Sequence, residues 1–480
     1  MRAIKYIIAV LLSLLLILSP VLVALGTALL LPPAFGDSFV GALGTKLDRL
    51  ASIEDEKIVV VGGSSVAFGL DSEALEAYVG MPVVNFGLYA ALGTKVMLDL
   101  SLPYIGEGDI VVVAPEIDEE ALSLYFGADT VWRALDGRFD ALRYIDFDNA
   151  PSMLGALFGF AGSKLDYARG KLEGTDTGIY LSKYFDGYGD FDYPRENNVM
   201  KLYWEQNNPI SLNTAAYDED TLVAFFDYVN AYAEKCTERG ASVYFSFSPM
   251  NAMAVSDGSD AISEFEEKIA ELLDFKVISD IESCILDAGY FYDTNYHLND
   301  AGRTVRTMRL ADDIRIAARL VRPPITEPEP TPPELPEQSV RFDGVDENCK
   351  YFTFEKLDSG AYSITGLTEL GKSATMLTVP LGYEGYIVQS VAEGAFSGSA
   401  LESLIVTRDA NLAYFDNGAF LGAGNLRHLW IYKASGDDIS PPESFYGVHT
   451  DFVVHIGRNT DFSYHYYWSE RGLDFVLDAN

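Results

Sequence analysis

Two serines in the stretch GGSS, Gly62 to Ser65, directly follow an apolar, β-branched run, Lys57–Val61. A serine on a sharp turn between a strand and a helix can act as a nucleophile, because its hydroxyl is exposed near helix amides. A phosphate-binding loop is the alternative, but it requires a following lysine or the GxGxxG pattern, and the stretch has neither. A plain turn is the simplest interpretation of the motif taken alone.

A nucleophilic serine needs a base, which is most often histidine. The chain has five histidines, at His297, His428, His449, His455 and His465. Four of them fall in a repetitive C-terminal region, so His297 is the one histidine available to the region around GGSS. Asp293 precedes it by four residues and could hold one ring nitrogen while the other faces a serine. Because the serines and His297 both follow strand-like segments, the pattern favours catalysis over a structural histidine.

Nearly continuous apolar runs predict the strands that must position these groups, since a parallel strand covered on both faces is apolar throughout. The expected strands are Lys57–Val61, Pro82–Phe86, Asp109–Ala114, Ser242–Phe247 and Lys276–Ser279. Helical patterns separate them at Ser72–Val79, Lys95–Ile105, Glu219–Arg239 and Ile262–Leu273. This alternation predicts a doubly wound α/β layer with a parallel sheet.

Residues 119–218 interrupt that alternation with a stretch rich in Tyr, Phe, Gly and Asp. Such an insertion either covers the site or forms an extra packing layer, and the sequence does not separate the two.

Charge and cysteine content exclude several classes of function. The chain has 71 acidic and 34 basic residues in 480, a formal net charge of -37, which repels nucleic acid. The three cysteines, Cys236, Cys284 and Cys349, lie far apart without metal-ligand spacing. We therefore expect no metal, no cofactor and no disulfide framework.

The N-terminus predicts a membrane anchor in residues 1–36. After Arg2 and Lys5, Tyr6 to Leu31 carries no charge and as a helix would span about 39 Å, more than the hydrocarbon core of a bilayer. The preceding basic residues place the N-terminus in the cytoplasm and the rest of the chain outside, at the cell surface. A cleaved signal peptide is the alternative.

A proline-rich acidic stretch, residues 323–338, predicts an extended spacer between an α/β domain, residues 37–322, and a C-terminal domain, residues 339–480. The C-terminal domain contains a repeat, because VAEGAFSGSALESLIV from Val391 recurs as FDNGAFLGAGNLRHLWI from Phe415. A spacing of 24 to 25 residues with leucines before a short strand is typical of a leucine-rich-repeat solenoid. The segment from 360 to 456 also resembles the BspA-like repeats of bacterial surface proteins.

Three segments of the α/β domain resemble blocks of the SGNH (GDSL-type) hydrolase superfamily: GGSS, VVNFGLYAALG from Val83, and YDTNYHLNDAG from Tyr292. The closer likeness is to its membrane-anchored bacterial branch, in which GSS replaces GDS. The resemblance implies a three-layer α/β/α, flavodoxin-like sheet. It also implies Ser65 as nucleophile and first oxyanion donor, Gly87 as second donor, His297 as base and Asp293 as its orienting carboxylate.

The sequence departs from the family pattern at two places. The carboxylate usually stands three residues before the histidine, where this chain has Thr294, and Asp293 stands at four. The asparagine that serves as a third oxyanion donor has no counterpart in VVVAPEIDEE, where Glu116 or Asp118 stands instead. A carboxylate would repel an oxyanion, so Asn251 is a candidate substitute and Glu116 a candidate for binding a sugar hydroxyl or an amine of the acyl acceptor.

These features predict an extracytoplasmic serine esterase or O-acyltransferase that acts on acyl esters of cell-envelope or exopolysaccharide polymers. The repeat domain would bind a protein or glycan, or serve only as a spacer. The alternative is a non-catalytic surface or adhesion protein whose α/β domain keeps the fold without turnover.

Overall fold

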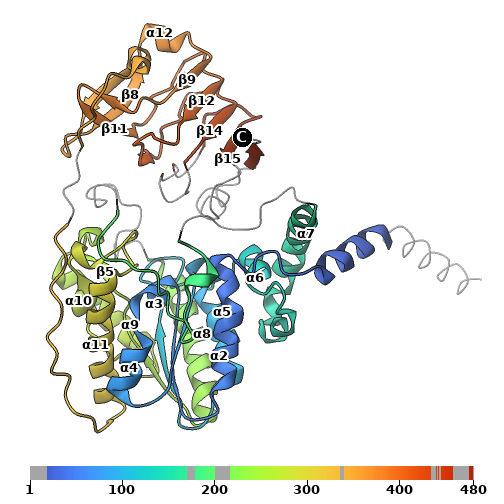
Figure 1. Cartoon of the computed structure of the whole chain (residues 1–480), viewed down its shortest axis with the longest axis vertical. Helices are drawn as coiled ribbons and strands as arrows, with labels where there is room; N and C mark the ends of the chain where they lie inside the picture. The colour runs from blue at the N-terminus through green and yellow to red at the C-terminus, as the bar shows by residue number, and fades with distance from the viewer. Residues whose placement is uncertain are drawn as a thin grey trace, which may run out of the picture. The chain divides into compact units, whose positions relative to one another are not determined.

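The computed structural model describes residues 19–169, 179–200, 214, 217–335, 340–433, 439, 442, 445–457 and 475–478. The chain forms two compact units, with the main division after Pro336 (Figure 1). Each unit has its own hydrophobic core, and each is described separately below.

A four-stranded parallel sheet forms the centre of the first unit. Its strands are β1 (Ile58–Gly62), β2 (Val83–Gly87), β3 (Ile110–Ala114) and β4 (Ser242–Phe245), in the order β2-β1-β3-β4. Beyond β4, Val277 makes a single parallel bridge with Phe245, so the expected strand Lys276–Ser279 is reduced to one residue pair. The prediction of a mixed α/β fold with a parallel sheet is confirmed.

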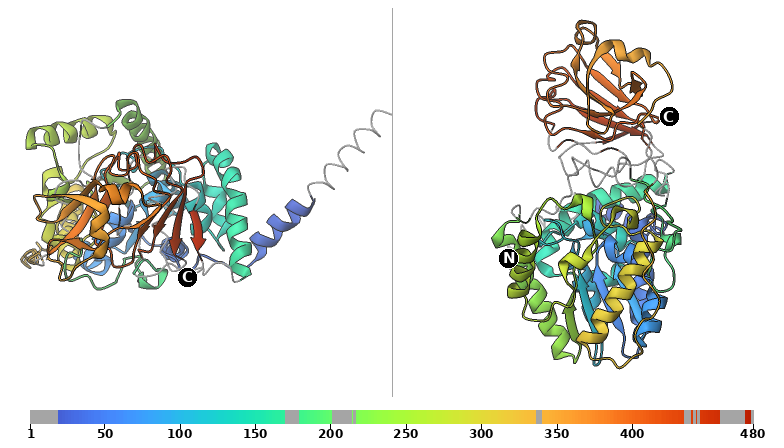
Figure 2. Two further views of the ribbon diagram at one scale, coloured as in Figure 1. Left: turned by 90° about the horizontal axis from the view of Figure 1, so that it is seen from above. Right: turned by 90° about the vertical axis from the view of Figure 1, so that its left-hand side faces the viewer.

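Side chains that alternate along each strand enter two different apolar clusters, one on each face of the sheet. Val59 and Val61 pack in the larger cluster, whereas Ile58 and Val60 pack in the smaller one. The larger cluster includes residues of α2 (Leu43–Ser52), α5 (Thr94–Ser101) and α8 (Glu219–Glu238), and the smaller one includes residues of α4 (Ser72–Val79) and α11 (Asp300–Ala317). Helices therefore cover both faces, which is why the strands are apolar throughout (Figures 1 and 2).

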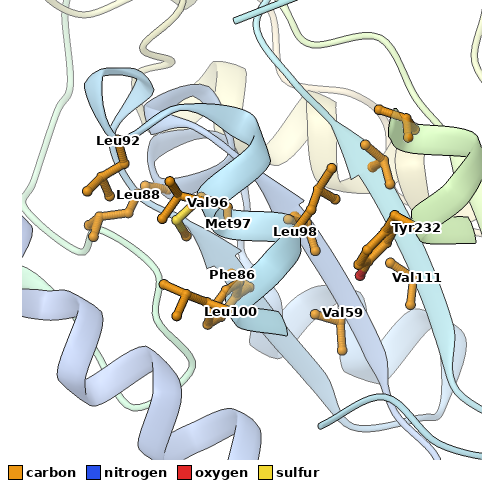
Figure 3. Packing of buried hydrophobic residues seen from close by; sticks show 14 of the residues in the cluster. Val59, Phe86, Leu88, Leu92, Val96, Met97, Leu98, Leu100, Val111 and Tyr232 are labelled. Carbon is orange, nitrogen blue, oxygen red and sulfur yellow. The ribbon is translucent and has the colours of Figure 1, made fainter. Parts of the chain in front are cut away.

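Figure 3 shows how α5 contributes to the larger cluster. Val96 and Leu100, four residues apart on this helix, lie near Phe86 of β2, and Leu98 lies between Val59 of β1 and Tyr232 of α8. All six of these residues are buried. Residues of one helix therefore join the sheet to its neighbouring helix.

The insertion begins with helical elements and returns to the sheet. Its described helices are α6 (Ala128–Ala134), η4 (Phe139–Tyr144), η5 (Phe147–Asn149), α7 (Ala150–Ala168) and η6 (Ser182–Tyr184). Farther along, the Asp190 carboxylate accepts hydrogen bonds from Ser72 N and Oγ, both at 2.6 Å, and from Asn85 Nδ2 at 2.8 Å. Burial raises the pKa of Asp190 to about 6. These contacts attach the returning segment to β2 and α4.

The proline-rich segment up to residue 335 has no regular secondary structure and lies against the first unit. Arg309 forms a two-point ion pair with Glu329, at 2.8 and 2.7 Å, and Tyr290 Oη donates to Pro330 O at 2.7 Å. We expected a spacer over residues 323–338, but its described part is bound along α11 and the turn before it. Residues 336–338 of that range lie outside the described residues.

Parallel strands from successive sequence repeats form a sheet in the second unit. This sheet has the order β16-β15-β14-β12-β9 and comprises β9 (Met376–Thr378), β12 (Ser403–Val406), β14 (His428–Ile431), β15 (Val453–Gly457) and β16 (Phe475–Asp478). A second sheet is built from β7 (Phe352–Lys356), β8 (Tyr362–Leu367), β10 (Gly382–Tyr383), β11 (Tyr386–Val391) and β13 (Tyr414–Phe415).

Equivalent residues of the sequence repeat lie next to one another in the second unit. Ser403 pairs with His428, and His428 pairs with Val453, which is an offset of 25 residues at each step. Phe420 stacks on Phe396 at 5.8 Å and on Phe445 at 5.3 Å between ring centroids. Each repeat thus adds one strand and one phenylalanine to the same stack.

The predicted anchor lies partly outside the described residues, because the description begins at residue 19. Residues 19–30 are helical. Within the part of the chain that the structure describes, no helix is both long enough and apolar enough to cross a bilayer.

Candidate active site

The candidate site lies at the carboxyl ends of two neighbouring strands. Ser64 begins the short helix α3 (Ser64–Gly69) directly after β1, and Glu116 follows β3. The chain leaves β1 toward β2 on one side of the sheet and crosses back to β3 on the other. In open α/β sheets, ligands bind in the crevice at such a reversal of strand order.

Both glycines of GGSS are required by close contacts. A Cβ atom on Gly62 would collide with Ala114 O of β3, and one on Gly63 would collide with the carboxylate of Glu116. The two residues therefore let the turn after β1 pack directly against the end of β3. This packing fixes the position of the serines that follow.

Ser64, His297 and Asp293 form a continuous hydrogen-bonded chain. Ser64 Oγ lies 2.8 Å from His297 Nε2, and His297 Nδ1 lies 2.8 Å from Asp293 Oδ1. Ser64 is 8% and His297 6% exposed, so the contact is largely protected from water. The arrangement has the order of a nucleophile, a base and a carboxylate that orients the base.

The expectation that Ser65 faces the histidine is wrong, because Ser64 occupies that place. Ser65 is only 1% exposed, and its Oγ has no hydrogen-bond partner among the described residues. Successive residues of an α-helix project about 100° apart, so only one of two adjacent serines can point at His297. The helix begins at Ser64, after Gly63, and this starting point directs the Ser64 side chain toward His297.

The turn that carries His297 explains the four-residue spacing to Asp293. His297 N donates to Thr294 Oγ1 at 3.0 Å, and His297 O accepts from Tyr292 N at 2.8 Å. Together these bonds hold the backbone in a tight loop whose two ends are Asp293 and His297. The Thr294 side chain therefore accepts a backbone hydrogen bond that holds the loop together.

A stack of rings fixes the plane of the imidazole. The His297 ring lies parallel to Phe68 of α3, with centroids 3.9 Å apart and planes 8° apart. Phe68 in turn stacks on Phe191 of the insertion at 4.2 Å. With Asp293 holding Nδ1, the stack leaves Nε2 directed at Ser64.

Tyr180 also belongs to the site, and sequence reasoning missed it. Its hydroxyl donates to Asp293 Oδ2 at 2.7 Å and lies 3.2 Å from His297 Nδ1. Tyr180 comes from the insertion, where many tyrosines occur without a motif that distinguishes one of them. The returning part of the insertion therefore supplies a direct contact to the carboxylate of the site.

Glu116 lies against the serines and is almost completely buried. Its Oε1 accepts a hydrogen bond from Ser65 N at 2.7 Å and lies 3.4 Å from Ser64 Oγ. Its Oε2 is buried and has no hydrogen-bond partner among the described residues. An ionised carboxylate in this place would compete with an oxyanion for the Ser65 amide.

The other expected oxyanion donors have different partners. Gly87 N donates to Asn85 Oδ1 at 3.1 Å. Asn251 Nδ2 donates to Asn295 Oδ1 at 3.2 Å, and its Oδ1 accepts from Met253 N at 3.0 Å. The described hydrogen bonds of the Asn251 side chain do not include Ser64, and they do not support the expectation that Asn251 replaces the missing asparagine.

Asp118 adds a second carboxyl group near Glu116. Its Oδ1 accepts from Ala121 N at 2.7 Å. Burial, with a smaller contribution from the charge of Glu116, raises the pKa of Asp118 to about 6. No group of three or more His, Cys, Asp or Glu residues among those described is arranged to hold a metal ion.

No protein-family model matches the chain, and no curated protein matches its sequence.

Proposed function

We propose that the first unit is a serine esterase or O-acyltransferase that works through an acyl-Ser64 intermediate. The observation that carries this proposal is the pair of 2.8 Å contacts joining Ser64 Oγ, His297 and Asp293. A buried serine hydroxyl with an imidazole at hydrogen-bond distance, itself held by a carboxylate, is the arrangement that activates serine for attack on a carbonyl carbon.

In the proposed reaction, Ser64 Oγ attacks the ester carbonyl while His297 Nε2 takes the hydroxyl proton. The tetrahedral intermediate then collapses, the ester C–O bond breaks, and the leaving alcohol receives that proton from His297. Water or an acceptor hydroxyl next attacks the acyl-serine, with His297 again accepting a proton and returning it to Ser64. Water gives hydrolysis, and an acceptor hydroxyl gives transfer.

In this proposal, the Glu116 carboxylate accepts the Ser65 N–H hydrogen bond while no substrate is bound. An oxyanion formed beside Ser64 would gain the Ser65 N–H only after Glu116 turns away, because both are hydrogen-bond acceptors. A substrate hydroxyl or amine that binds Glu116 would serve this purpose. The role proposed for Glu116 in binding the acceptor is therefore compatible with its position.

The resemblance to SGNH hydrolases supports the proposal if the nucleophile motif is aligned one residue earlier in the sequence. With Ser64 as nucleophile, the family's Gly-Asp-Ser falls on Gly62, Gly63 and Ser64 rather than one residue later. Helices on both faces of a β2-β1-β3-β4 sheet are compatible with a three-layer, SGNH-like fold. One parallel strand for each repeat is likewise compatible with a leucine-rich-repeat solenoid of the BspA-like kind.

The proposed substrates are acyl esters of cell-envelope or exopolysaccharide polymers. This part of the proposal depends on the uncharged segment Tyr6–Leu31 as an anchor that places the site outside the cytoplasm. The net charge of -37 argues against polyanionic substrates such as nucleic acid. The repeat unit would contribute an extended surface for a protein or glycan.

A non-catalytic surface protein is the second candidate. This candidate is favoured because two expected oxyanion donors already have other hydrogen-bond acceptors. Ser65 N donates to Glu116, and Gly87 N donates to Asn85. Loss of one such donor typically costs about 10²- to 10³-fold in rate. A site with both amides permanently occupied would bind without turning over.

Labelling with a fluorophosphonate separates the two candidates, because the reagent reports an activated serine without requiring the natural substrate. We expect the full-length protein and the Ser65→Ala variant to be labelled and the Ser64→Ala variant to remain unlabelled. Label retained in Ser64→Ala would reject this nucleophile. Absence of label and of short-chain ester turnover in the folded wild type would favour the non-catalytic candidate.

A further inference from the structure

Helix α7 of the insertion exposes a continuous apolar face. Leu154 and Phe158, four residues apart and therefore neighbours on the helix surface, are 64% and 60% exposed. Phe147, just before the helix, is also exposed. From Ala150 to Ser163 the helix carries no charged residue, although the whole chain has 71 acidic residues. Exposed apolar patches of this kind mark contact sites for proteins or membranes.

The opposite side of α7 is fixed firmly to the first unit. Phe160 is buried and stacks on Trp132 of α6, with ring centroids 5.2 Å apart. Trp132 Nε1 also donates to Met153 O at 2.8 Å. The exposed face is therefore the outer side of a well-packed helix, and its apolar residues are not required by the core of the unit.

The same helix holds the chain where the uncharged N-terminal segment ends. Lys164 forms a buried 2.6 Å ion pair with Asp136, and its Nζ donates to Leu31 O at 3.0 Å. Asp136 Oδ2 accepts from Ala34 N at 2.7 Å. Residues 31 to 34 are thus attached to α7 and to the turn after α6, and Figures 1 and 2 show the N-terminal helix leaving the unit beside these elements.

We propose that the Leu154–Phe158 face of α7 rests in the interfacial layer of the bilayer in which Tyr6–Leu31 is anchored. The partner is lipid because α7 is attached to the end of a segment long enough to span a membrane. Apolar helix faces that lie in this layer are buried about 5–10 Å deep at the boundary between headgroups and acyl chains. This inference depends on the anchor and is independent of the chemistry at Ser64.

Electrostatics explain why this face should have no charge. Anionic headgroups repel acidic proteins, and the chain has a net charge of -37. The helix itself carries no carboxylate from Ala150 to Ser163 that anionic lipid would repel, whereas the exposed Asp129 lies beside Gly159 and the exposed Asp148 follows Phe147. Contact at α7, added to the anchor, would restrict how the first unit tilts relative to the membrane.

Fluorescence of a label on the full-length protein tests the inference. In a Cys349→Ser background, where the remaining Cys236 and Cys284 are buried, single cysteines replace Leu154, Phe158 or, as control, the exposed Glu264 of α9 (Ser259–Leu272). Each variant carries the polarity-sensitive dye NBD and is reconstituted in phosphatidylcholine and phosphatidylglycerol vesicles. Part of the lipid carries a doxyl quencher on its acyl chain.

We expect the dye at positions 154 and 158 to shift to shorter wavelength and to be quenched by the doxyl lipid, with little effect at position 264. Equal quenching of all three positions by aqueous iodide would overturn the inference. So would failure of the protein to remain with the vesicles, because the anchor is then absent. A shift that depends on protein density without doxyl quenching would assign the face to a second copy of the chain instead.

Discussion

The Tyr180 hydroxyl and the Asp293 carboxylate are joined by a 2.7 Å hydrogen bond that links the insertion to the candidate active site. Asp293 is thereby held from two sides, by Tyr180 at Oδ2 and by His297 at Oδ1. The insertion therefore does more than pack against the sheet, because it determines how the carboxylate is presented to the imidazole.

Removing this hydroxyl should slow the proposed chemistry. We expect Tyr180→Phe to lower the rates of Ser64 phosphonylation and ester turnover by about 10- to 100-fold, since a hydrogen bond to a charged group contributes roughly 1.5–3 kcal/mol. The matched control is Tyr184→Phe, the same change in the same insertion, which should retain the wild-type rate. Wild-type turnover in a folded Tyr180→Phe protein would show that the Tyr180 hydroxyl does not assist the reaction and that the residue only packs against the site.

Neutralising Glu116 should have the opposite effect. Glu116→Gln keeps an acceptor for the Ser65 N–H but removes the charge beside the place where an oxyanion would form. We expect phosphonylation of Ser64 to accelerate by about tenfold or more, since relief of roughly 1.4 kcal/mol of repulsion is enough. Glu119→Gln, at an exposed position nearby, should leave the rate unchanged. A slower Glu116→Gln enzyme would instead assign the carboxylate a required role.

Asp118 should make stability depend on pH. Its pKa is raised from 3.8 to about 6 in the folded protein, so folding favours the protonated carboxyl group. The corresponding stability is present below about pH 4 and is lost as the pH rises through 6. We therefore expect Asp118→Asn to unfold like the wild type at pH 4 and to be more stable at pH 7.5, by at most about 3 kcal/mol. Guanidinium unfolding at the two pH values measures this difference, and equal stability at pH 7.5 would contradict it.

The phenylalanine stack should account for much of the stability of the repeat unit. Phe420 is fully buried between Phe396 and Phe445, so Phe420→Ala should cost about 3–5 kcal/mol. Hydrogen exchange should accelerate at the amides of β12 and β14. Leu421→Ala, at a neighbouring position that is 37% exposed, serves as the control and should have a much smaller effect. Unchanged exchange in Phe420→Ala would show that the stack contributes little.

The central sheet could be predicted from sequence because burial on both faces makes each strand continuously apolar. The expected strand Lys57–Val61 differs from β1 by one residue at each end, and the expected helix Ser72–Val79 matches α4. His297 could be found for a different reason, since it is the only histidine before the repeats. The strands and His297 could therefore be found from residue types and their positions in the sequence alone.

The remaining features of the site depend on geometry that a linear pattern does not contain. The choice between Ser64 and Ser65 is set by the residue at which α3 begins, and one residue of helical phase separates them. Tyr180 reaches Asp293 from 113 positions away, through a segment with no periodic signal. Asn251 follows a strand end, as a site residue would, yet its amide is used to shape its own turn.

The equal offsets between β12, β14 and β15 have an evolutionary consequence. Because Ser403, His428 and Val453 follow one another at equal intervals, each strand pairs with an equivalent residue of the strand before it. A duplication or deletion of one such interval in the gene would leave every remaining pairing in phase. Related genes can therefore differ in the number of repeats while the neighbouring strands retain their partners.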